Sequence, residues 1–194
     1  MMRSLKNIYK VIAAVILLIC TPKMAEAQEW AVSTNVLSWL NLGTINAEGA
    51  YKVNDHVSVN AALAINPWQI NTPTFVTLRN RQYGGHMGAR YWPWHTFSEW
   101  WVGAKVQYKN FEQVGLLSSN LMRGDALGAG LSAGYSMMIA ENVNLDFGLG
   151  FWGGRLLSYV EYNDNIANPS KIRTEGPRNF IFLDSISVSV AYIF

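Results

Sequence analysis

Apolar and polar residues alternate along eight segments of the chain, and this pattern predicts β-strands. In the last segment, FIFLDSISVSVAYIF at 180–194, large apolar residues from Ile186 onward alternate with Ser187, Ser189 and Ala191. Successive side chains of a strand point to opposite faces, so this segment has one apolar face and one small, polar face. The other segments that alternate are 30–37, 44–53, 57–65, 81–92, 100–108, 126–137 and 143–151.

The connections between these segments differ in length in a regular way. Those after the second, fourth and sixth segments are short, and the first of them, Asn54-Asp55-His56, is rich in residues that favour turns. Those after the third, fifth and seventh, residues 69–80, 109–123 and 160–177, are long. Short turns at one end and long loops at the other are typical of outer-membrane barrels. The fold predicted is all-β: an up-and-down, eight-stranded antiparallel transmembrane β-barrel with both termini on the periplasmic side.

A soluble barrel or sandwich is the alternative, and its apolar face would form the core. The polar face here carries charged residues together with glycines such as Gly128, Gly130 and Gly134. An eight-stranded barrel has room inside only for side chains, which favours small residues and paired charges there. On the water-exposed face of a soluble sheet, the same glycines would only weaken the strands. We therefore expect the polar face to point inward and the apolar face to meet lipid.

Aromatic residues gather near the ends of the segments, as they do in the two girdles that flank the apolar band of membrane barrels. Near the predicted periplasmic ends are Trp30, Tyr51, Tyr91, Trp92, Trp94, Trp100, Trp101, Tyr135 and Phe194. Near the opposite ends are Trp39, Trp68, Tyr108, Phe111, Tyr159 and Phe180.

The first 27 residues have the features of a secretory signal peptide. Basic residues precede an apolar run at 11–20 that is too short to span a bilayer, and Ala25-Glu26-Ala27 fits an A-x-A cleavage site. We predict a signal peptide at 1–27, cleavage between Ala27 and Gln28, and a barrel at 28–194. Acylation of Cys20, as in a lipoprotein, is an alternative, but the residue before a lipoprotein cysteine is normally small and here it is isoleucine.

The charge of the chain gives no support to a nucleic-acid partner. The formal net charge is +2, but residues 1–27 hold four basic residues against Glu26, a net charge of +3, which leaves −1 for 28–194. A basic surface of the kind that binds nucleic acid is therefore not expected. No apolar run in 28–194 is long enough for a membrane-spanning helix.

Four motifs resemble those of a known family. Ser33-Thr34-Asn35-Val36-Leu37 lies in the first segment, Asn66-Pro67-Trp68 follows the third, Arg90-Tyr91-Trp92-Pro93 closes the fourth, and the sixth is glycine-rich through 128–135. Together they resemble a family of small outer-membrane barrels of Gram-negative bacteria that is classed as a domain of unknown function. The resemblance covers nearly all of 28–194 and implies location in the outer membrane without a known activity. Some relatives are thought to accompany surface-fimbria genes, which implies surface or fimbrial partners.

The last strand also resembles the closing strand of outer-membrane barrels, where an aromatic final residue is part of the signal read by the barrel-assembly machinery. This resemblance implies that Phe194 and Tyr192 act as an assembly signal. The expected partners are then outer-membrane lipid and the barrel-assembly machinery.

The predicted inner face carries the ionisable side chains that are candidates for a site. We expect an interior polar network of Glu48, Arg90, Lys105, Asp146 and His86, in which Glu48 pairs with Arg90 and Asp146 with Lys105. A hydrolytic triad of His86, Asp146 and Ser132 is disfavoured, because a narrow, filled lumen keeps a substrate away from mid-barrel positions. The sequence has no metal-ligand spacing, no G-x-S-x-G and no phosphate-binding loop. We therefore expect no catalytic residue, no cofactor and no metal.

The function expected is a non-enzymatic structural or surface-interaction role. A general porin is not expected, because Trp101, Trp152 and the interior charges would fill the lumen. The last loop, with charges of both signs, is equally compatible with a recognition loop and with a solvated surface. The alternative function is an outer-membrane lipid- or peptide-modifying enzyme, whose histidine and serine should lie at the extracellular rim or on the apolar exterior.

Overall fold

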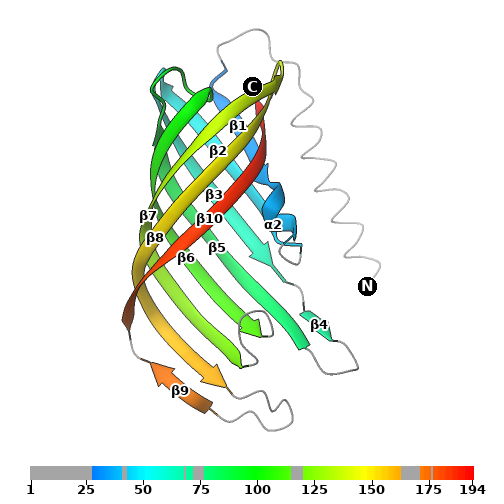
Figure 1. The fold of residues 1–194 in the computed structure, drawn as a ribbon, viewed down its shortest axis with the longest axis vertical. Helices are drawn as coiled ribbons and strands as arrows, with labels where there is room; N and C mark the ends of the chain where they lie inside the picture. The colour runs from blue at the N-terminus through cyan, green and yellow to red at the C-terminus, as the bar shows by residue number, and fades with distance from the viewer. Residues whose placement is uncertain are drawn as a thin grey trace.

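A computed structural model describes residues 28–40, 43–67, 69–71, 77–114, 120–162, 171–175 and 177–194. The predicted signal peptide at 1–27 and Trp68 of the N-P-W motif lie outside these residues. The described chain forms a closed eight-stranded antiparallel β-barrel, which confirms the predicted fold class (Figure 1). The strands of its wall are β1 (Trp30–Asn35), β2 (Ile45–Asn54), β3 (Val57–Asn66), β5 (Thr77–Tyr91), β6 (Glu99–Val114), β7 (Leu121–Ala140), β8 (Val143–Tyr162) and β10 (Arg178–Ile193).

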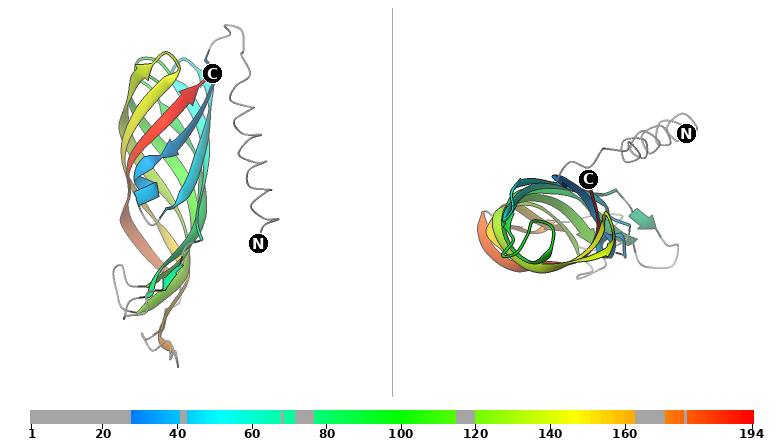
Figure 2. Two further views of the ribbon diagram at one scale, coloured as in Figure 1. Left: turned by 90° about the vertical axis from the view of Figure 1, so that its right-hand side faces the viewer. Right: turned by 90° about the horizontal axis from the view of Figure 1, so that it is seen from above.

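Each strand of the wall pairs with the next in the chain, and β10 closes the barrel by pairing with β1 as well as β8. Two short strands prolong the wall: β4 (Gln69–Asn71) pairs with β5, and β9 (Lys171–Glu175) pairs with β8. Short connections at 55–56, 92–98 and 141–142 lie at one end, which we call the turn end. Phe194 lies at the same end, and the opposite end is the loop end (Figure 2).

The long connections predicted at 69–80, 109–123 and 160–177 are wrong in large part. Strand β6 continues to Val114, β7 already begins at Leu121, and β8 runs on to Tyr162 instead of ending at Phe151. These extensions lie at the loop end beyond the apolar stretch, where both faces of a strand can be polar. Alternation, on which the prediction rested, disappears there although backbone pairing continues.

The first strand is shorter than predicted. It ends at Asn35, and Val36–Leu40 form the short helix α2 instead of the end of a strand and a connection. No helix in the described part of the chain is long and apolar enough to cross a bilayer.

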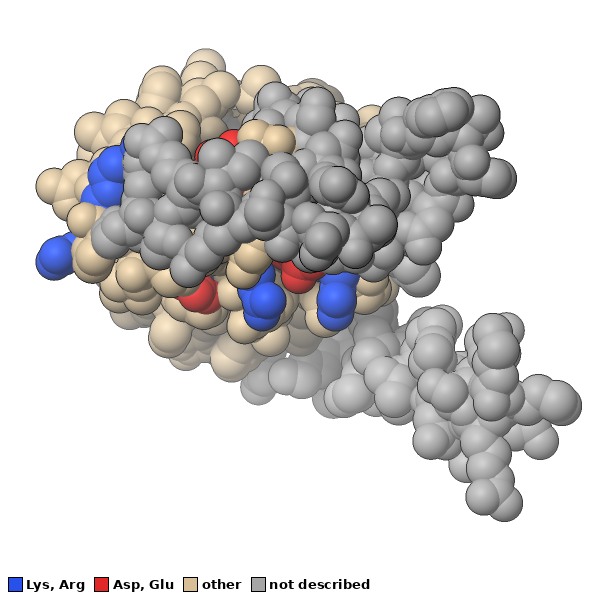
Figure 3. Space-filling model, turned by 90° about the horizontal axis from the view of Figure 1, so that it is seen from below, with Lys and Arg blue, Asp and Glu red and all other residues tan. Residues whose placement is uncertain are grey.

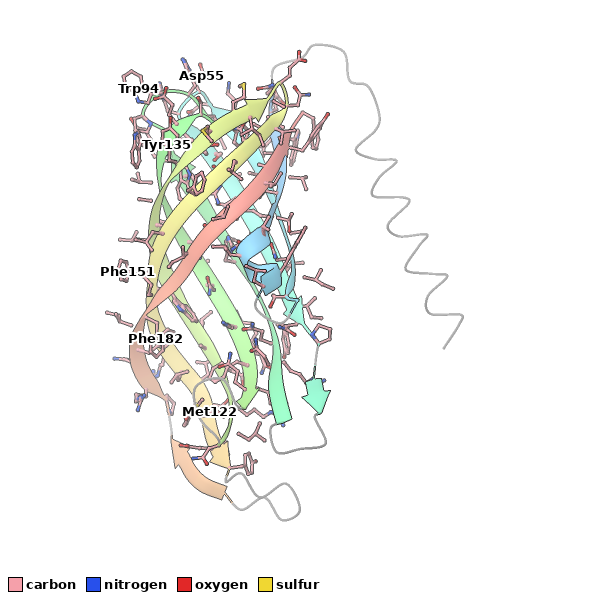
Figure 4. All side chains as sticks on the ribbon, turned by 45° about the vertical axis from the view of Figure 1, so that its right-hand side comes forward. Asp55, Trp94, Met122, Tyr135, Phe151 and Phe182 are labelled. Carbon is pink, nitrogen blue, oxygen red and sulfur yellow. The ribbon has the colours of Figure 1, made fainter. Side chains whose placement is uncertain are left out.

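The wall turns its apolar residues outward, as the alternation predicts. Leu131 in the middle of β7 keeps 70% of its surface exposed, and Phe151 of β8 stands out from the wall at mid-height (Figure 4). Trp94 and Tyr135 lie near the turn end, with Asp55 beyond them (Figure 4).

Two apolar clusters fill the interior. One, at the turn end, consists of Ala31, Ala50, Trp92, Phe97, Trp101 and Ile193, and the other, nearer the loop end, of Ala126, Trp152, Leu156 and Phe180 with Phe111 against it. Trp92, Trp101, Phe111 and Phe180 therefore lie inside the barrel and do not belong to an outer aromatic girdle. Glycine makes room for this packing: a Cβ at Gly134 or Gly148 would collide with the Trp101 ring or come within 3.2 Å of it.

Candidate functional site

Side chains close the barrel at its turn end. Trp92 is only 1% exposed and meets Phe97 edge to face, with ring centroids 5.8 Å apart, and the Trp101 ring centroid lies 6.2 Å from that of Trp92. The Trp92 indole N–H donates to Ser58 Oγ over 3.0 Å. Phe97 reaches the interior through a backbone φ of 68°, a left-handed conformation that is uncommon for a residue with a side chain. The lumen is therefore plugged at this end.

A charged network lies directly on this plug. The Arg90 guanidinium is 2.6 Å from one oxygen of Glu48 and 3.6 Å from Asp146 Oδ2, and it stacks over the Trp101 ring at 4.4 Å from the centroid. The second oxygen of Glu48 lies 3.1 Å from His86 Nε2. Since an ionised carboxylate only accepts hydrogen bonds, this contact requires the proton of His86 on Nε2. Arg90 thus joins strands β2, β5, β6 and β8 across the lumen.

A cavity of about 410 Å³ lies on the loop-end side of the network. Its charged lining consists of Glu48, Arg90, Lys105 and Lys109, with His86 beside them, and Asp146 also pairs with Arg90, so three cationic groups stand against two carboxylates. Gln82 also lines the cavity and is 9% exposed, and its Oε1 has no hydrogen-bond partner within the described residues. A buried amide oxygen of this kind normally finds a donor, which a ligand or water in the cavity can supply.

The first strand ends at a pair of asparagines beside this cavity. The Asn46 side chain replaces a strand partner for Asn35: its Oδ1 accepts from Asn35 N at 2.6 Å, and its Nδ2 donates to Asn35 O at 3.0 Å. The Asn35 side chain in turn accepts from Leu37 N at 3.0 Å, which caps α2, and from Val188 N of β10 at 3.4 Å. We call Asn35 and Asn46 the asparagine clasp.

Plugged at the turn end and lined by polar, apolar and mostly cationic side chains, the cavity has the size of a small-molecule site and not of a channel. No group of three or more His, Cys, Asp or Glu side chains that could hold a metal occurs in the part of the chain that the structure describes.

Comparison with known proteins gives one family. A family model described as "Protein of unknown function (DUF3575)" matches residues 12–194. The chain belongs to this family. No curated protein matches the sequence. Membership in DUF3575 adds no activity to the geometry described above, so the site has to be interpreted from its own residues.

The structure brings together four of the five residues predicted as an interior network. Glu48 pairs with Arg90, His86 joins Glu48, and Asp146 takes the same arginine and not the Lys105 that was expected. Lys105 lines the cavity wall on the neighbouring strand. Asp146 pairs with Arg90 because the Arg90 guanidinium, stacked on the Trp101 ring, lies within reach of both Glu48 and Asp146.

The other predicted residues lie on the barrel's surface. Phe194 is paired through its backbone with Trp30, and the Tyr192 ring lies 6.1 Å from the Phe194 ring. Of the mixed-charge loop, Glu161 accepts a hydrogen bond from Asn120. Gln28 is the first described residue, so the predicted cleavage site at Ala27 lies at the edge of the described chain.

Sequence reasoning missed Gln82 and the asparagine clasp. Asn35 stood in a motif used only for the family resemblance, and no role was assigned to it. The sequence carries a signal for the helix, because asparagine is a preferred N-cap residue and Asn35 precedes Val36-Leu37-Ser38-Trp39-Leu40.

Proposed function

We propose that the mature chain is a β-barrel of the bacterial outer membrane with a structural or surface-interaction role, and that it is not a general porin. The observation that carries the proposal is an inverted wall, apolar outside and polar within. Its outward positions between Trp100 and Tyr108 are Val102, Ala104 and Val106, while the inward ones include Lys105 and Gln107. A soluble barrel would bury the first set and expose the second.

The dimensions of this wall suit a membrane. Trp100 and Tyr108 are eight residues apart on β6, which is about 27 Å along a strand. With the strand tilt of roughly 40° that such barrels have, the height is about 20 Å, and the rings at both ends bring it close to the 25 Å of known apolar bands.

Paired aromatic rings at the two ends of this band support the same placement. At the turn end, Trp30 contacts Tyr51 at a centroid distance of 4.6 Å, and Trp100 contacts Tyr135 at 5.2 Å. At the other end, Tyr83 and Tyr108 lie 6.4 Å apart. Aromatic side chains with a polar edge favour the membrane–water interface.

The plug at the turn end supports the absence of a general pore. Purified protein in planar bilayers should give no stable conductance of porin size, because Trp92, Phe97 and Trp101 occupy the lumen. Steady open channels in wild-type protein would contradict this part of the proposal. Arg81, exposed at the loop end, provides a control variant, Arg81→Gln, that should leave the conductance unchanged.

The strands that extend beyond the band support an interaction role. Strands β7 and β8 form a hairpin that continues to Leu121 and Tyr162, and charged side chains of both signs lie around the rim in the view from the loop end (Figure 3). Paired strands that project rigidly from a barrel present a preformed surface to a partner. Surface or fimbrial proteins are the partners we propose.

A second candidate function, a lipid- or peptide-modifying enzyme, is favoured by one observation, the Glu48–His86 pair beside the cavity. Affinity capture of the barrel from native membranes should be scored for partner proteins and for altered lipid A in the same cells. Recovery of a stoichiometric surface protein, with lipid A unchanged in a His86→Ala strain, supports the interaction role. Lipid A that changes with His86→Ala and not with Arg81→Gln would favour the enzyme.

A further inference from the structure

The barrel wall has a seam between α2 and β10. Strand β1 has 6 residues and β10 has 16, and their pairing stops at Asn35 and Ser189. From Val188 to Arg178, β10 pairs with β8 on one edge and, among the described residues, with no strand on the other. In Figure 1 no strand runs between this half of β10 and α2, and β5 and β6 of the far wall are visible behind it.

The seam leads into the cavity. The cavity lining includes Leu37 and Ser38 of α2 on one side of the seam and Ile186 and Ser187 of β10 on the other, in addition to the interior residues Glu48 and Arg90. The asparagine clasp holds the end of β1 at this place, so the strand stops at a defined residue with its hydrogen bonds satisfied. The short first strand is thus a built feature of the wall.

An open strand edge inside a bilayer is costly unless water or a ligand covers it, because hydrocarbon offers no hydrogen bonds. The seam lies within the apolar band, since Ile186 and Leu183 on β10 face outward beside it. Helix α2 covers part of it and exposes Leu40 at 80% to the exterior. Among the residues that the structure describes, the seam is therefore a polar-edged gap with apolar surroundings that no strand covers from the side.

The interior beside the seam offers two kinds of surface. Phe180 and Phe182 stack at 5.4 Å on the inner face of β10, and Trp152 packs against Phe180 at 4.6 Å. Phe182 remains 54% exposed although the register pairs it with the inward Trp152. Four residues further along β10 the cavity lining begins at Ile186 and Ser187, and the cavity presents three cationic groups, one carboxylate and the unpartnered oxygen of Gln82. An apolar strip followed by a cationic, hydrogen-bonding pocket matches an amphiphile with an anionic head.

We infer that the seam is a lateral port through which a single-chain anionic amphiphile enters from the surrounding lipid, with its acyl chain along Phe180 and Phe182 and its head in the cavity. This inference rests on the proposed location in the outer membrane. Long-chain carboxylates and lysophospholipid phosphates share the required chemistry.

Photolabelling of the wild-type barrel in phosphatidylcholine nanodiscs tests the port. The probes are palmitic acid, a lysophosphatidic acid and the matching fatty alcohol, each with a diazirine in the chain, and adducts are mapped by mass spectrometry. Both anionic probes should label the inward Phe180, Phe182 and Trp152 as well as the outward Phe151 and Leu131. The alcohol should label the inward set less by about fivefold, the upper end of the effect of one exposed ion pair. If only one anionic probe reaches the inward set, that result names the head group.

The outcomes separate the two proposals. Adducts on the outward set alone would agree with the membrane location of the barrel and would overturn the port. Adducts on neither set would overturn the membrane location. Equal inward labelling by acid and alcohol would overturn the anionic head.

A bulky side chain in the seam tests the route. Ser38 of α2 lies beside the seam and lines the cavity together with Ile186 and Ser187 of β10, so Ser38→Trp places a ring at the proposed entrance. The matched control is Ala133→Trp on the exposed outer face of β7. In barrels that keep the heat-dependent gel mobility of the wild type, Ser38→Trp should lower inward labelling and leave outward labelling unchanged, and Ala133→Trp should lower neither. Unchanged inward labelling in folded Ser38→Trp would overturn lateral entry.

Discussion

Replacement of Arg90 by methionine tests whether the interior network holds the barrel together. The variant keeps an unbranched side chain over Trp101 but leaves Glu48 and Asp146 without their shared cation. At an effective dielectric constant of about 20, the attraction across the 3.6 Å to Asp146 alone is about 4–5 kcal/mol. In the native protein, the cost of desolvating the three charged groups offsets much of this attraction. When the cation is removed, the cost of burying the two carboxylates remains. Breaking such a pair costs about 3–5 kcal/mol, and the lost cation–π contact adds about 0.5–2 kcal/mol.

The assay is urea unfolding in lipid vesicles, followed by tryptophan fluorescence, for wild type, Arg90→Met, Glu48→Gln and the double variant. Arg90→Met should lower the free energy of unfolding by at least about 3 kcal/mol. In the double variant the loss should be smaller than the sum of the two single losses by about 1–3 kcal/mol, since the groups are in contact. The exposed Arg81→Met is the matched control and should change little. A loss below about 1 kcal/mol for Arg90→Met would refute the reasoning, because it is what an exposed ion pair contributes.

Three further predictions concern the wall. Asn46→Ala removes both bonds to the Asn35 backbone and should cost about 1–3 kcal/mol in the same assay; an unchanged midpoint would argue against the clasp. Phe194→Ala should lower the amount of barrel inserted in cells, measured by immunoblot of membranes, and leave the melting temperature of refolded protein nearly unchanged, because its backbone bonds to Trp30 persist. Early melting with normal insertion would reverse that assignment. Asp125, beyond the apolar band, accepts from Asn110 and Tyr108, which lowers its pKa. A lowered folded-state pKa stabilises the fold above the unfolded pKa, so the stability lost in Asp125→Asn should be full at pH 7 and should shrink as the pH falls from about 4 through the lowered folded-state pKa; a loss independent of pH would contradict this.

Alternation along the chain was enough to predict eight strands in the wall and the face of most of their residues. It did not predict that β1 stops at Asn35, nor that Trp92 and Phe180 lie inside and not in an outer girdle. It placed Glu48 and Arg90 on the inner face, and their pairing followed from opposite charge. It failed at the loop end, where the hairpins leave the apolar band and pairing leaves no trace in the pattern of side chains.

The plug was predictable in part. Tyr91-Trp92 and Trp100-Trp101 are consecutive aromatics, and neighbours on a strand must face opposite sides, so one of each pair had to point inward. The partner of Asp146 and the asparagine clasp were not predictable, because they depend on the stagger between strands and on where β1 stops.

Fractionation of cells that express the full chain tests the central claim most directly. Membranes are separated on a sucrose density gradient, washed with urea, and analysed by electrophoresis with and without heating. A β-barrel in the outer membrane should appear in the dense fraction, resist the urea wash and migrate differently after heating, because its closed ladder of strands resists detergent until heated. Recovery of folded protein in the soluble fraction without detergent would contradict the account.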